Sequence, residues 1–345
     1  MERVVRFSAP REVELVEVEE RRPGAGEVRV RTLLSGISAG TELTAYRGSN
    51  PYLAKRWDGE RRLFVDGEPT FAYPLDGWGY EQVGEVVAVG DGVAQVRPGD
   101  RVWGAWGHRS GAVVAHDRVA GRVLADGAQR MVGVFARIGA IALNAVLDAA
   151  VNVGETVAVF GQGVPGLLAT QLARGSGATV VAVDRIPRRL ELARAVGAHH
   201  VLDASAGASA EAIRDLTDGR GADVAIDLSG SYDALAEAIR ATAYASRVVA
   251  AGFYQGGGAA LRLGEELHHN RVELVSSQIS GIAPRLAHRW TPLRLERTIV
   301  DLAADGRLEL EALVSHVVPA AQAAEAFRLL DEQPGEAVQV VLDFS

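Results

Sequence analysis

The turn Gly161-Gln162-Gly163-Val164-Pro165-Gly166 follows the apolar run 157–160 and has the spacing G-x-G-x-x-G. The first glycine of such a turn permits a tight bend, and the second lets a pyrophosphate approach backbone N–H groups at a helix N-terminus. The third allows helix and strand to pack closely, and a proline in the first helical turn costs little. The pattern predicts a dinucleotide site that includes Gly161, Gly163, Val164, Pro165 and Gly166.

An acidic residue, Asp184, ends the next apolar run, about 20 residues after the turn. Its carboxylate would accept hydrogen bonds from ribose hydroxyls and repel a 2′-phosphate, which favours NAD. Arg185, with Arg188 and Arg189 close by, could instead pair with that phosphate, so NADP stays open. A domain of this type that binds no dinucleotide is the alternative, and the complete strand–turn–helix–strand–acid pattern disfavours it.

Three further loops follow apolar runs in this part of the chain. In parallel sheets ligands bind at the carboxyl ends of the strands, so these loops are expected at the same edge as the glycine-rich turn. A backbone group near Gln278 would reach the nicotinamide carboxamide. The loop residues expected to bind the cofactor are Ser229, Gly230, Gly252, Phe253, Ser277 and Gln278.

Strand and helix patterns alternate between about residues 133 and 280. Strands are expected at 156–160, 179–183, 199–202, 223–227, 247–251 and 272–277, with helices such as 165–175 and 188–196 between them. This alternation predicts an α/β fold with a doubly wound parallel sheet. Residues 126–285 are therefore predicted to form a Rossmann dinucleotide-binding domain.

Short β-type runs punctuated by glycine and proline fill residues 1–125, for example 27–32, 84–90 and 101–103. After about residue 290 the sequence predicts helices at 293–305 and 320–331 and a last strand at 337–343. The simplest arrangement returns this tail to the first domain. We therefore predict a β-rich domain that is discontinuous in sequence, made of residues 1–125 and 286–345.

The composition excludes several classes of protein. The chain has 345 residues, 48% hydrophobic and 23% charged, which is typical of an ordinary globular protein. A net charge of −8 argues against nucleic acid as a partner, and no uninterrupted apolar stretch has the length of a membrane span. Without a signal-like apolar region after Met1, a cytoplasmic location is expected. No residue is cysteine, so disulfides, thiolate nucleophiles and cysteine-held zinc are absent.

Taken together, these motifs resemble the medium-chain dehydrogenase/reductase superfamily, in particular its zinc-type alcohol dehydrogenases. The resemblance spans essentially the whole chain. Ser35-Gly36-Ile37-Ser38-Ala39-Gly40-Thr41-Glu42 stands where the family shows a G-I-C-G-T-D type segment. Gly79-Tyr80-Glu81 stands at the family's G-H-E position. The resemblance implies a GroES-like catalytic domain beside the Rossmann domain and hydride transfer between NAD(P) and an alcohol.

The departures from the family lie at its metal ligands. The cysteine ligand is replaced by Ser38 or Ala39, the histidine ligand by Tyr80, and the third ligand position falls near Ala136 or Arg137. The four-cysteine lobe of the structural zinc is missing. A residual zinc site on His108, His116, Glu42 and Glu81 is possible in principle, but none of these residues has the spacing of a helix-face metal pair. The resemblance therefore points to a branch without zinc.

Without a metal, hydrogen-bond donors must stabilise the substrate oxyanion. The resemblance places Tyr80 where a zinc ligand faced the substrate oxygen, so its phenol is the first candidate, with space filling as the alternative. To act as a base near neutral pH it would need a lowered pKa, which His108 or an arginine could supply. Thr41 matches a hydroxyl that relays protons in the family. Glu42 and Glu81 are candidates for acid/base chemistry or for orienting substrate hydroxyls, and structural roles remain the alternative.

The segment from Tyr46 to about residue 75 is long and rich in arginine, acidic and aromatic residues. Long loops in compact domains are often lids or binding segments. The mixture suits a polyhydroxylated substrate, and an ordered surface or oligomer contact is the alternative.

These observations favour a zinc-independent, NAD(P)-dependent oxidoreductase that interconverts a polar secondary alcohol, such as a sugar or cyclitol, and its ketone. An NADPH-dependent quinone or enoyl reductase and a non-catalytic NAD-binding homologue are the alternatives. By resemblance, a homodimer or homotetramer is expected to form through the strand at 272–277.

Overall fold

The computed structural model describes residues 1–345, and it folds into two units. The first contains Met1–Arg137 and Val314–Ser345, and the second contains Ile138–Leu313. The first unit is thus discontinuous, although its boundaries differ from the predicted ones. Residues 286–313 lie in the second unit because Gln171 exchanges hydrogen bonds of 3.1 and 2.7 Å with the backbone of Glu309.

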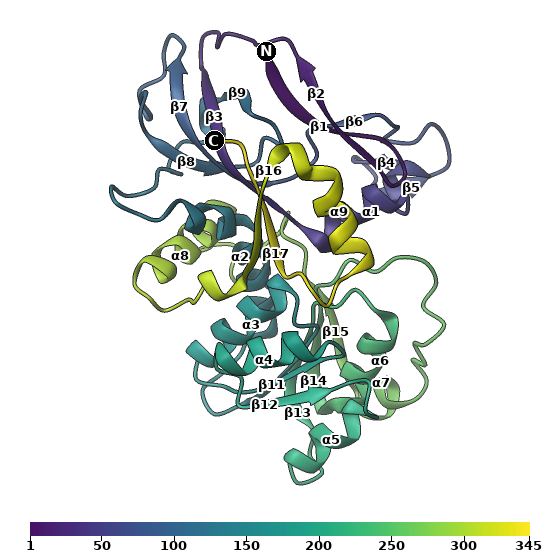
Figure 1. Ribbon diagram of the computed structural model, residues 1–345. Helices are drawn as coiled ribbons and strands as arrows, with labels where there is room; N and C mark the ends of the chain where they lie inside the picture. The colour runs from purple at the N-terminus through teal and green to yellow at the C-terminus, as the bar shows by residue number, and fades with distance from the viewer. The chain divides into compact units, whose positions relative to one another are not determined.

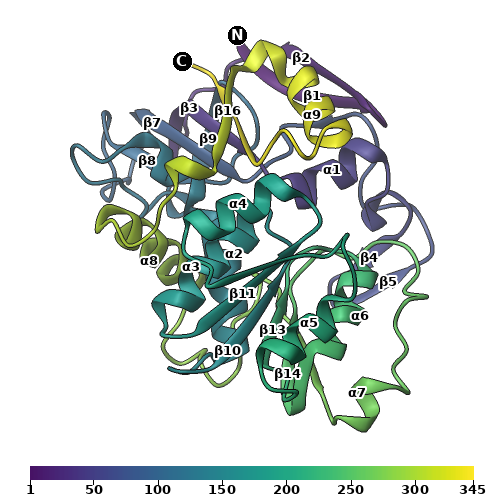
Figure 2. The same cartoon turned by 60° about the horizontal axis from the view of Figure 1, so that its bottom comes forward.

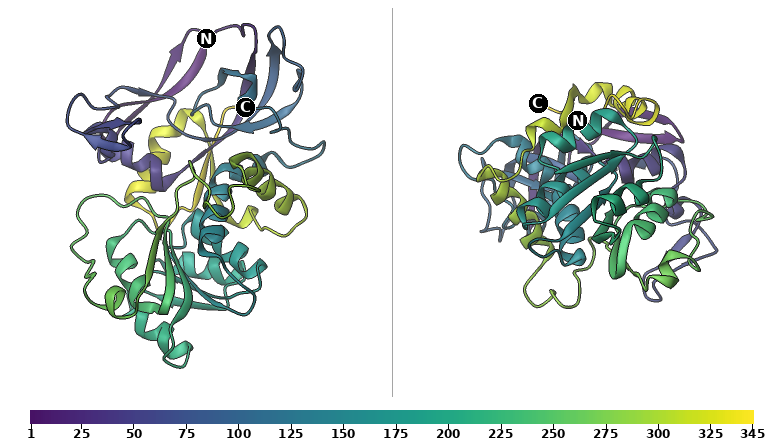
Figure 3. Two further views of the ribbon diagram at one scale, coloured as in Figure 1. Left: turned by 180° about the vertical axis from the view of Figure 1, so that it is seen from behind. Right: turned by 90° about the horizontal axis from the view of Figure 1, so that it is seen from below.

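The main sheet of the first unit has the order β16-β17-β3-β7-β8, and β9 also pairs with β3. A smaller sheet has the order β2-β1-β6. The strands are β1 (Glu2–Ala9), β2 (Glu12–Val18), β3 (Glu27–Ile37), β6 (Leu75–Asp76), β7 (Glu81–Val89), β8 (Arg101–Gly104), β9 (Gly111–Ala115), β16 (Val314–Pro319) and β17 (Gln339–Asp343). Figures 1 and 3 show the C-terminal strands beside β3. The C-terminal strand β17 pairs directly with β3 in this sheet.

Helices α1 (Ala39–Arg47) and α9 (Ala323–Glu332) complete the core of the first unit. Phe7, Tyr46 and Phe327 are buried there, and the rings of Phe7 and Phe327 meet edge to face with centroids 5.0 Å apart. Short 3₁₀ turns are η1 (Pro51–Leu53), η2 (His116–Arg118) and η4 (Ala320–Gln322), and a two-stranded hairpin is formed by β4 (Arg56–Asp58) and β5 (Leu63–Val65). Packing of α1 against this core fixes the segment that carries Ser38, Thr41 and Glu42.

The second unit contains the predicted parallel sheet of six strands, in the order β12-β11-β10-β13-β14-β15. These strands are β10 (Thr156–Phe160), β11 (Thr179–Asp184), β12 (His200–Asp203), β13 (Ala222–Asp227), β14 (Thr242–Ala250) and β15 (Glu273–Ser276). Helices α3 (Val164–Gly175) and α4 (Pro187–Ala195) contact each other on one face, and α5 (Ser209–Leu216) and α6 (Tyr232–Ala241) contact each other on the other (Figure 2). The chain also forms α7 (Glu266–His269), α8 (Pro292–Ala304) and η3 (Glu311–Leu313).

Helix α2 (Arg130–Ala149) precedes the parallel sheet. It is the one helix that is long and apolar enough to cross a membrane by length and composition, but 72% of that stretch is buried within the protein. The side chain of Ile299 in α8 occupies the space over Gly139, 2.6 Å from where a Cβ would lie. The apolar character of α2 is thus explained by packing inside the fold.

Candidate functional site

Strand pairing brings the two family-like segments of the first unit together. Gly36 of β3 is paired with Glu81 of β7, so Tyr80, just before β7, meets the turn that leads from β3 into α1. Gly79 has φ +125°, and the His108 ring lies 2.7 Å from where its Cβ would be. A glycine is needed there because both the backbone angle and the histidine exclude a side chain. These constraints hold Tyr80 in place.

Three hydroxyl groups meet at this turn. The Tyr80 phenol is hydrogen-bonded to the Ser38 hydroxyl, and its oxygen lies 3.4 Å from Oγ1 of Thr41. Burial raises the pKa of Tyr80 well above its ordinary value. The expectation that a nearby cation lowers this pKa is wrong, because no cation faces the phenol among these contacts. The phenol is therefore a proton donor rather than a ready base.

Glu42 and His108 form a fully buried pair behind this turn, with Oε2 and Nε2 2.6 Å apart. The other ring nitrogen of His108 lies 2.6 Å from the Ser35 hydroxyl, which accepts a hydrogen bond from the Gln82 amide. The second carboxylate oxygen of Glu42 accepts the backbone N–H of Ser38 at 3.1 Å. Because the polar atoms of Glu42 and His108 bond to other groups inside the protein, these two residues are suited to fixing the turn that carries Ser38.

Glu81 is a buried carboxyl group, 1% exposed, and neither of its oxygens has a hydrogen-bond partner. One oxygen lies over Gly36, where the amide nitrogen of Gln339 also approaches. Burial, and then the charge of Glu42, raise the pKa of Glu81 well above its ordinary range. A carboxyl group in such a place is held in its neutral form, which can donate a proton.

The residues of this region do not fit a zinc ion. Zinc needs thiolate, imidazole or carboxylate ligands that converge on one point. The structure contains no group of three or more histidine, aspartate or glutamate side chains arranged to hold a metal. Ser38 and Tyr80 bond to each other, Glu42 and His108 form their own pair, and His116 is directed to the carbonyl of Gly26 at 2.9 Å.

The glycine-rich turn in the second unit has the form that a dinucleotide requires. Gly161 has φ +83°, and Gly163 precedes α3 without any side chain capping the helix. A Cβ on Gly166 would lie 1.8 Å from the Gly161 carbonyl oxygen, so only glycine fits. Val164 and Pro165 form the first helical turn. The uncapped N-terminus leaves N–H groups and the positive end of the helix dipole for a pyrophosphate.

Asp184 ends β11 beside this turn and is 7% exposed. Its two oxygens accept the backbone N–H groups of Gln162 and Ile186 at 2.6 and 2.9 Å. Burial lowers the pKa of the Arg189 guanidinium, and the charge of Asp184 opposes that effect. Asp184 thus fixes the turn and has a cationic neighbour, so NAD and NADP both remain compatible with these residues.

The other predicted loops do lie at the carboxyl edge of the sheet. A Cβ on Gly161 would lie 2.7 Å from Ser229 Cα, and a Cβ on Gly252 would lie 2.4 Å from the Gly230 nitrogen. Phe253 is 38% exposed. The Ser277 hydroxyl accepts a hydrogen bond from Asn144 at 3.2 Å, and Gln278 accepts the backbone N–H of Ser280 at 2.6 Å.

Sequence reasoning left three residues out of the candidate site. Ser38 was identified only as a residue that replaces a metal ligand of the family. The available signal was that Tyr80 replaces another ligand of the same metal. Asp227 ends β13, is fully buried and accepts the Tyr254 hydroxyl at 2.7 Å. Burial raises the pKa of both groups. Their positions after two neighbouring parallel strands were the signal for this pair.

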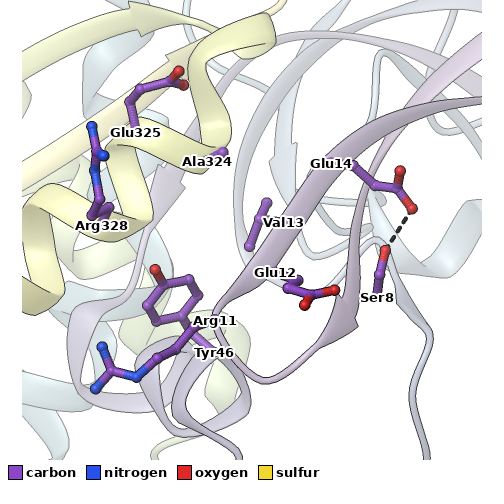
Figure 4. Close-up of a pocket in the computed structure, with 9 residues that line it drawn as sticks. All are labelled: Ser8, Arg11, Glu12, Val13, Glu14, Tyr46, Ala324, Glu325 and Arg328. Atoms are coloured by element: carbon purple, nitrogen blue, oxygen red, sulfur yellow. Dashed lines mark hydrogen bonds between the residues drawn. The ribbon is translucent and has the colours of Figure 1, made fainter.

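A hollow of about 460 Å³ lies between β1, β2 and α9 in the first unit (Figure 4). It is lined by Ser8, Arg11, Glu12, Val13, Glu14, Tyr46, Ala324, Glu325 and Arg328. The Arg11 guanidinium bonds to Asp331 at 2.6 Å, and the Ser8 hydroxyl bonds to Glu14 at 2.5 Å. It contains none of the predicted site residues.

Comparison with known proteins identifies a family for each of the two halves of the chain. Residues 24–158 match the alcohol dehydrogenase GroES-like domain, and residues 165–292 match the zinc-binding dehydrogenase family. D-guloside 3-dehydrogenase from Escherichia coli (strain K12) is 31% identical over 345 aligned residues, which cover 98% of each chain.

Two solved structures align with 99% of this chain over 99% of their own length. A zinc-binding dehydrogenase from Sinorhizobium meliloti 1021 bound to NADP has a TM-score of 0.80 at 23% identity. An alcohol dehydrogenase from E. coli CFT073 complexed with NADH has a TM-score of 0.78 at 22% identity. At such identities the similarity shows the common fold.

Proposed function

The chain belongs to the medium-chain dehydrogenase/reductase superfamily, among the zinc-type alcohol dehydrogenases, and on that premise we propose that it oxidises a secondary hydroxyl of a sugar or glycoside without zinc. It is an oxidoreductase that acts on CH–OH donors with NAD(P). The observation that carries the proposal is the contact of the Ser38 and Tyr80 hydroxyls, at positions where the family resemblance puts metal ligands, with the Thr41 hydroxyl beside them.

In this proposal the nicotinamide cofactor, held by the Gly161–Gly166 turn, supplies the chemistry of hydride acceptance and donation. Tyr80 and Ser38 direct hydroxyl donors at the oxygen of the substrate, where negative charge develops. A phenol with a raised pKa remains a donor at neutral pH. In the oxidation, the proton of the substrate hydroxyl passes to the Tyr80 oxygen while the phenol's own proton leaves through Thr41 to solvent, and in the reduction it returns by the same path, so the phenol stays protonated throughout.

Glu81 supports the same chemistry from behind. As a buried neutral acid next to Tyr80 it holds a proton without adding a negative charge beside the developing oxyanion. Glu42 and His108 act as positioning residues, because their contacts fix the Ser38 backbone rather than touch the phenol. In this proposal Tyr80 and Thr41 are hydroxyl donors, Glu81 holds a proton, and Glu42 and His108 support the turn.

A sugar or glycoside is favoured over a simple alcohol by the guloside relative and by the polar character of this site. A reducing enzyme for quinones or enoyl groups is not favoured by the named relatives, which are dehydrogenases. Assembly into a dimer or tetramer and a cytoplasmic location stay predictions.

The test combines turnover with metal analysis. Purified protein is incubated with NAD or NADP and with methyl glycosides, polyols and a simple aliphatic alcohol, and formation of the reduced cofactor is followed. We expect turnover of a glycoside or polyol that survives exhaustive chelation, with much less than one zinc per chain. Stoichiometric zinc whose removal abolishes turnover would overturn the metal-free mechanism, and inactivity with every alcohol would overturn the function.

A further inference from the structure

Five aromatic rings form a continuous series in the segment between α1 and β7. Ring centroids are 5.0 Å apart for Trp78–Phe71 and Phe71–Tyr52, 5.2 Å for Tyr52–Phe64 and 4.9 Å for Phe64–Trp57. We call this series the aromatic track. Its inner end, Trp78, stands two positions before Tyr80 in the sequence, and its outer end lies on the β4–β5 hairpin, where Trp57 is paired with Phe64.

The outer end of the track is open to solvent. Trp57 is 37% exposed, Phe64 is 40% exposed, and Leu63 at the start of β5 is 56% exposed. Aromatic rings that serve only a core are normally buried, because their apolar area is large. These rings contact each other in series and still leave apolar surface uncovered, which is the property of a binding surface.

The segment is held in place by hydrogen bonds to the helix that carries Thr41. The Asn50 side chain donates to Oγ1 of Thr44 at 2.7 Å, and that hydroxyl donates to the Thr41 carbonyl at 2.7 Å. The Phe71 N–H donates to the Tyr52 carbonyl at 2.9 Å, and the Trp57 N–H donates to the Thr70 hydroxyl at 2.8 Å. The segment is therefore anchored to the helix that carries Thr41.

The charges around the hairpin identify the kind of partner. Its basic side chains are balanced by an equal set of acidic ones, so no net charge favours a phosphate, a nucleic acid or an anionic membrane. The basic residues are Lys55, Arg56, Arg61 and Arg62, and the acidic residues are Asp58, Glu60, Asp66 and Glu68. Exposed aromatic faces with polar groups of both signs around them suit a neutral ring that has an apolar face and hydroxyl groups.

We propose that the aromatic track is a subsite for the aglycone of a glycoside substrate, the part attached through the glycosidic oxygen to the sugar that is oxidised. This inference rests on the proposed function and deepens it, since it makes the substrate a glycoside rather than a free sugar. Three ring contacts separate Trp78 from Phe64, so the first ring beyond the glycosidic oxygen lies towards Trp78 and a second one stacks on Phe64 and Trp57, while the reacting sugar lies at the hydroxyl cluster.

The test compares three substrates that share one reacting sugar: its methyl glycoside, its biphenyl glycoside and a trisaccharide in which that sugar is terminal. The double variant Trp57→Ala/Phe64→Ala removes the exposed rings, and Tyr244→Ala, an exposed aromatic of the other unit, is the matched control. Wild type should favour a substrate with two rings beyond the reacting sugar over the methyl glycoside in kcat/KM by about tenfold, since two ring contacts each contribute roughly 2- to 10-fold. The double variant should lose that preference and keep its activity on the methyl glycoside.

The two arms separate an aryl group from a sugar as the ring that stacks at the outer end, and a preference in either arm that the double variant loses supports the track. Titration with the biphenyl glycoside should also quench tryptophan fluorescence in wild type and not in Trp57→Phe. An unchanged preference in the double variant overturns the track and leaves the proposed function standing, as does a changed oligomeric size with unchanged preference. If no alcohol is turned over, the proposed function fails, and absence of quenching then overturns the track as well.

Discussion

Replacement of Tyr80 by phenylalanine removes one hydroxyl from the cluster and leaves the ring in place. Loss of a single donor to a developing oxyanion typically lowers kcat by about 10²–10³, which corresponds to ~2.7–4 kcal/mol. In this protein the Ser38 hydroxyl is bonded to the phenol and can partly take over its role, so a loss of roughly 10² is expected. Folding stability should fall by only ~0.5–1.5 kcal/mol, the net contribution of one hydrogen bond.

The assay is steady-state turnover of the best glycoside at saturating cofactor, with thermal unfolding as the control for folding. Ser38→Ala and the Ser38→Ala/Tyr80→Phe double variant complete a mutant cycle. Because the two hydroxyls are bonded to each other, the double variant should lose less activity than the product of the single losses. KM for the cofactor should be unchanged, since its binding residues lie in the other unit. Tyr80→Phe activity close to wild type would refute the assignment of the phenol as the main donor, and fully multiplicative losses would refute the shared role.

The remaining predictions concern proton linkage, the buried pair and the cofactor. The raised pKa of Glu81 means that folding favours its neutral form, so stability that is present at acid pH is lost as the pH rises above the ordinary glutamate pKa of about 4.3. Glu81→Gln should flatten this pH dependence of the free energy of unfolding, measured by urea titrations across pH. Parallel curves for the two proteins would contradict the prediction. His108→Ala should lower the free energy of unfolding by about 3–5 kcal/mol because it leaves Glu42 buried without its partner, and a loss well below this range would show that the pair is not structural. Asp184→Ser should weaken discrimination against NADP by roughly 10-fold or more, because hydrogen bonds to a charged group contribute ~1.5–3 kcal/mol. The measurement is the ratio of kcat/KM for NAD to that for NADP. An unchanged ratio would show that Asp184 does not select the cofactor.

Much of the second unit could be predicted because its signals are local. Apolar runs of strand length, glycines at fixed spacing and an acid after the next run each depend on neighbouring residues, and the structure forms all six predicted strands in one parallel sheet. The position of 286–313 was harder. The hydrogen bonds between Gln171 and Glu309 join residues 138 positions apart and have no counterpart in a sequence pattern.

The candidate site was only partly visible in the sequence for the same reason. Tyr80 and Thr41 were identified through their family-like motifs, and the structure places them 3.4 Å apart. The pairing of His108 with Glu42 could not be foreseen, because the two residues are 66 positions apart and come from different segments. Without that pairing, His108 was expected to act on the phenol.

The last strand of the first unit sets the order in which this enzyme can mature. The Gln339 amide approaches Glu81 and donates to the Ile37 carbonyl across 302 positions of sequence. Residues 138–313 are synthesised before β17. During synthesis, the edge of β3 that pairs with β17 is therefore unpaired while the dinucleotide-binding half is already complete. An unpaired strand edge of this kind is prone to pair with other chains and to aggregate. Activity should therefore arise only after translation has passed residue 343.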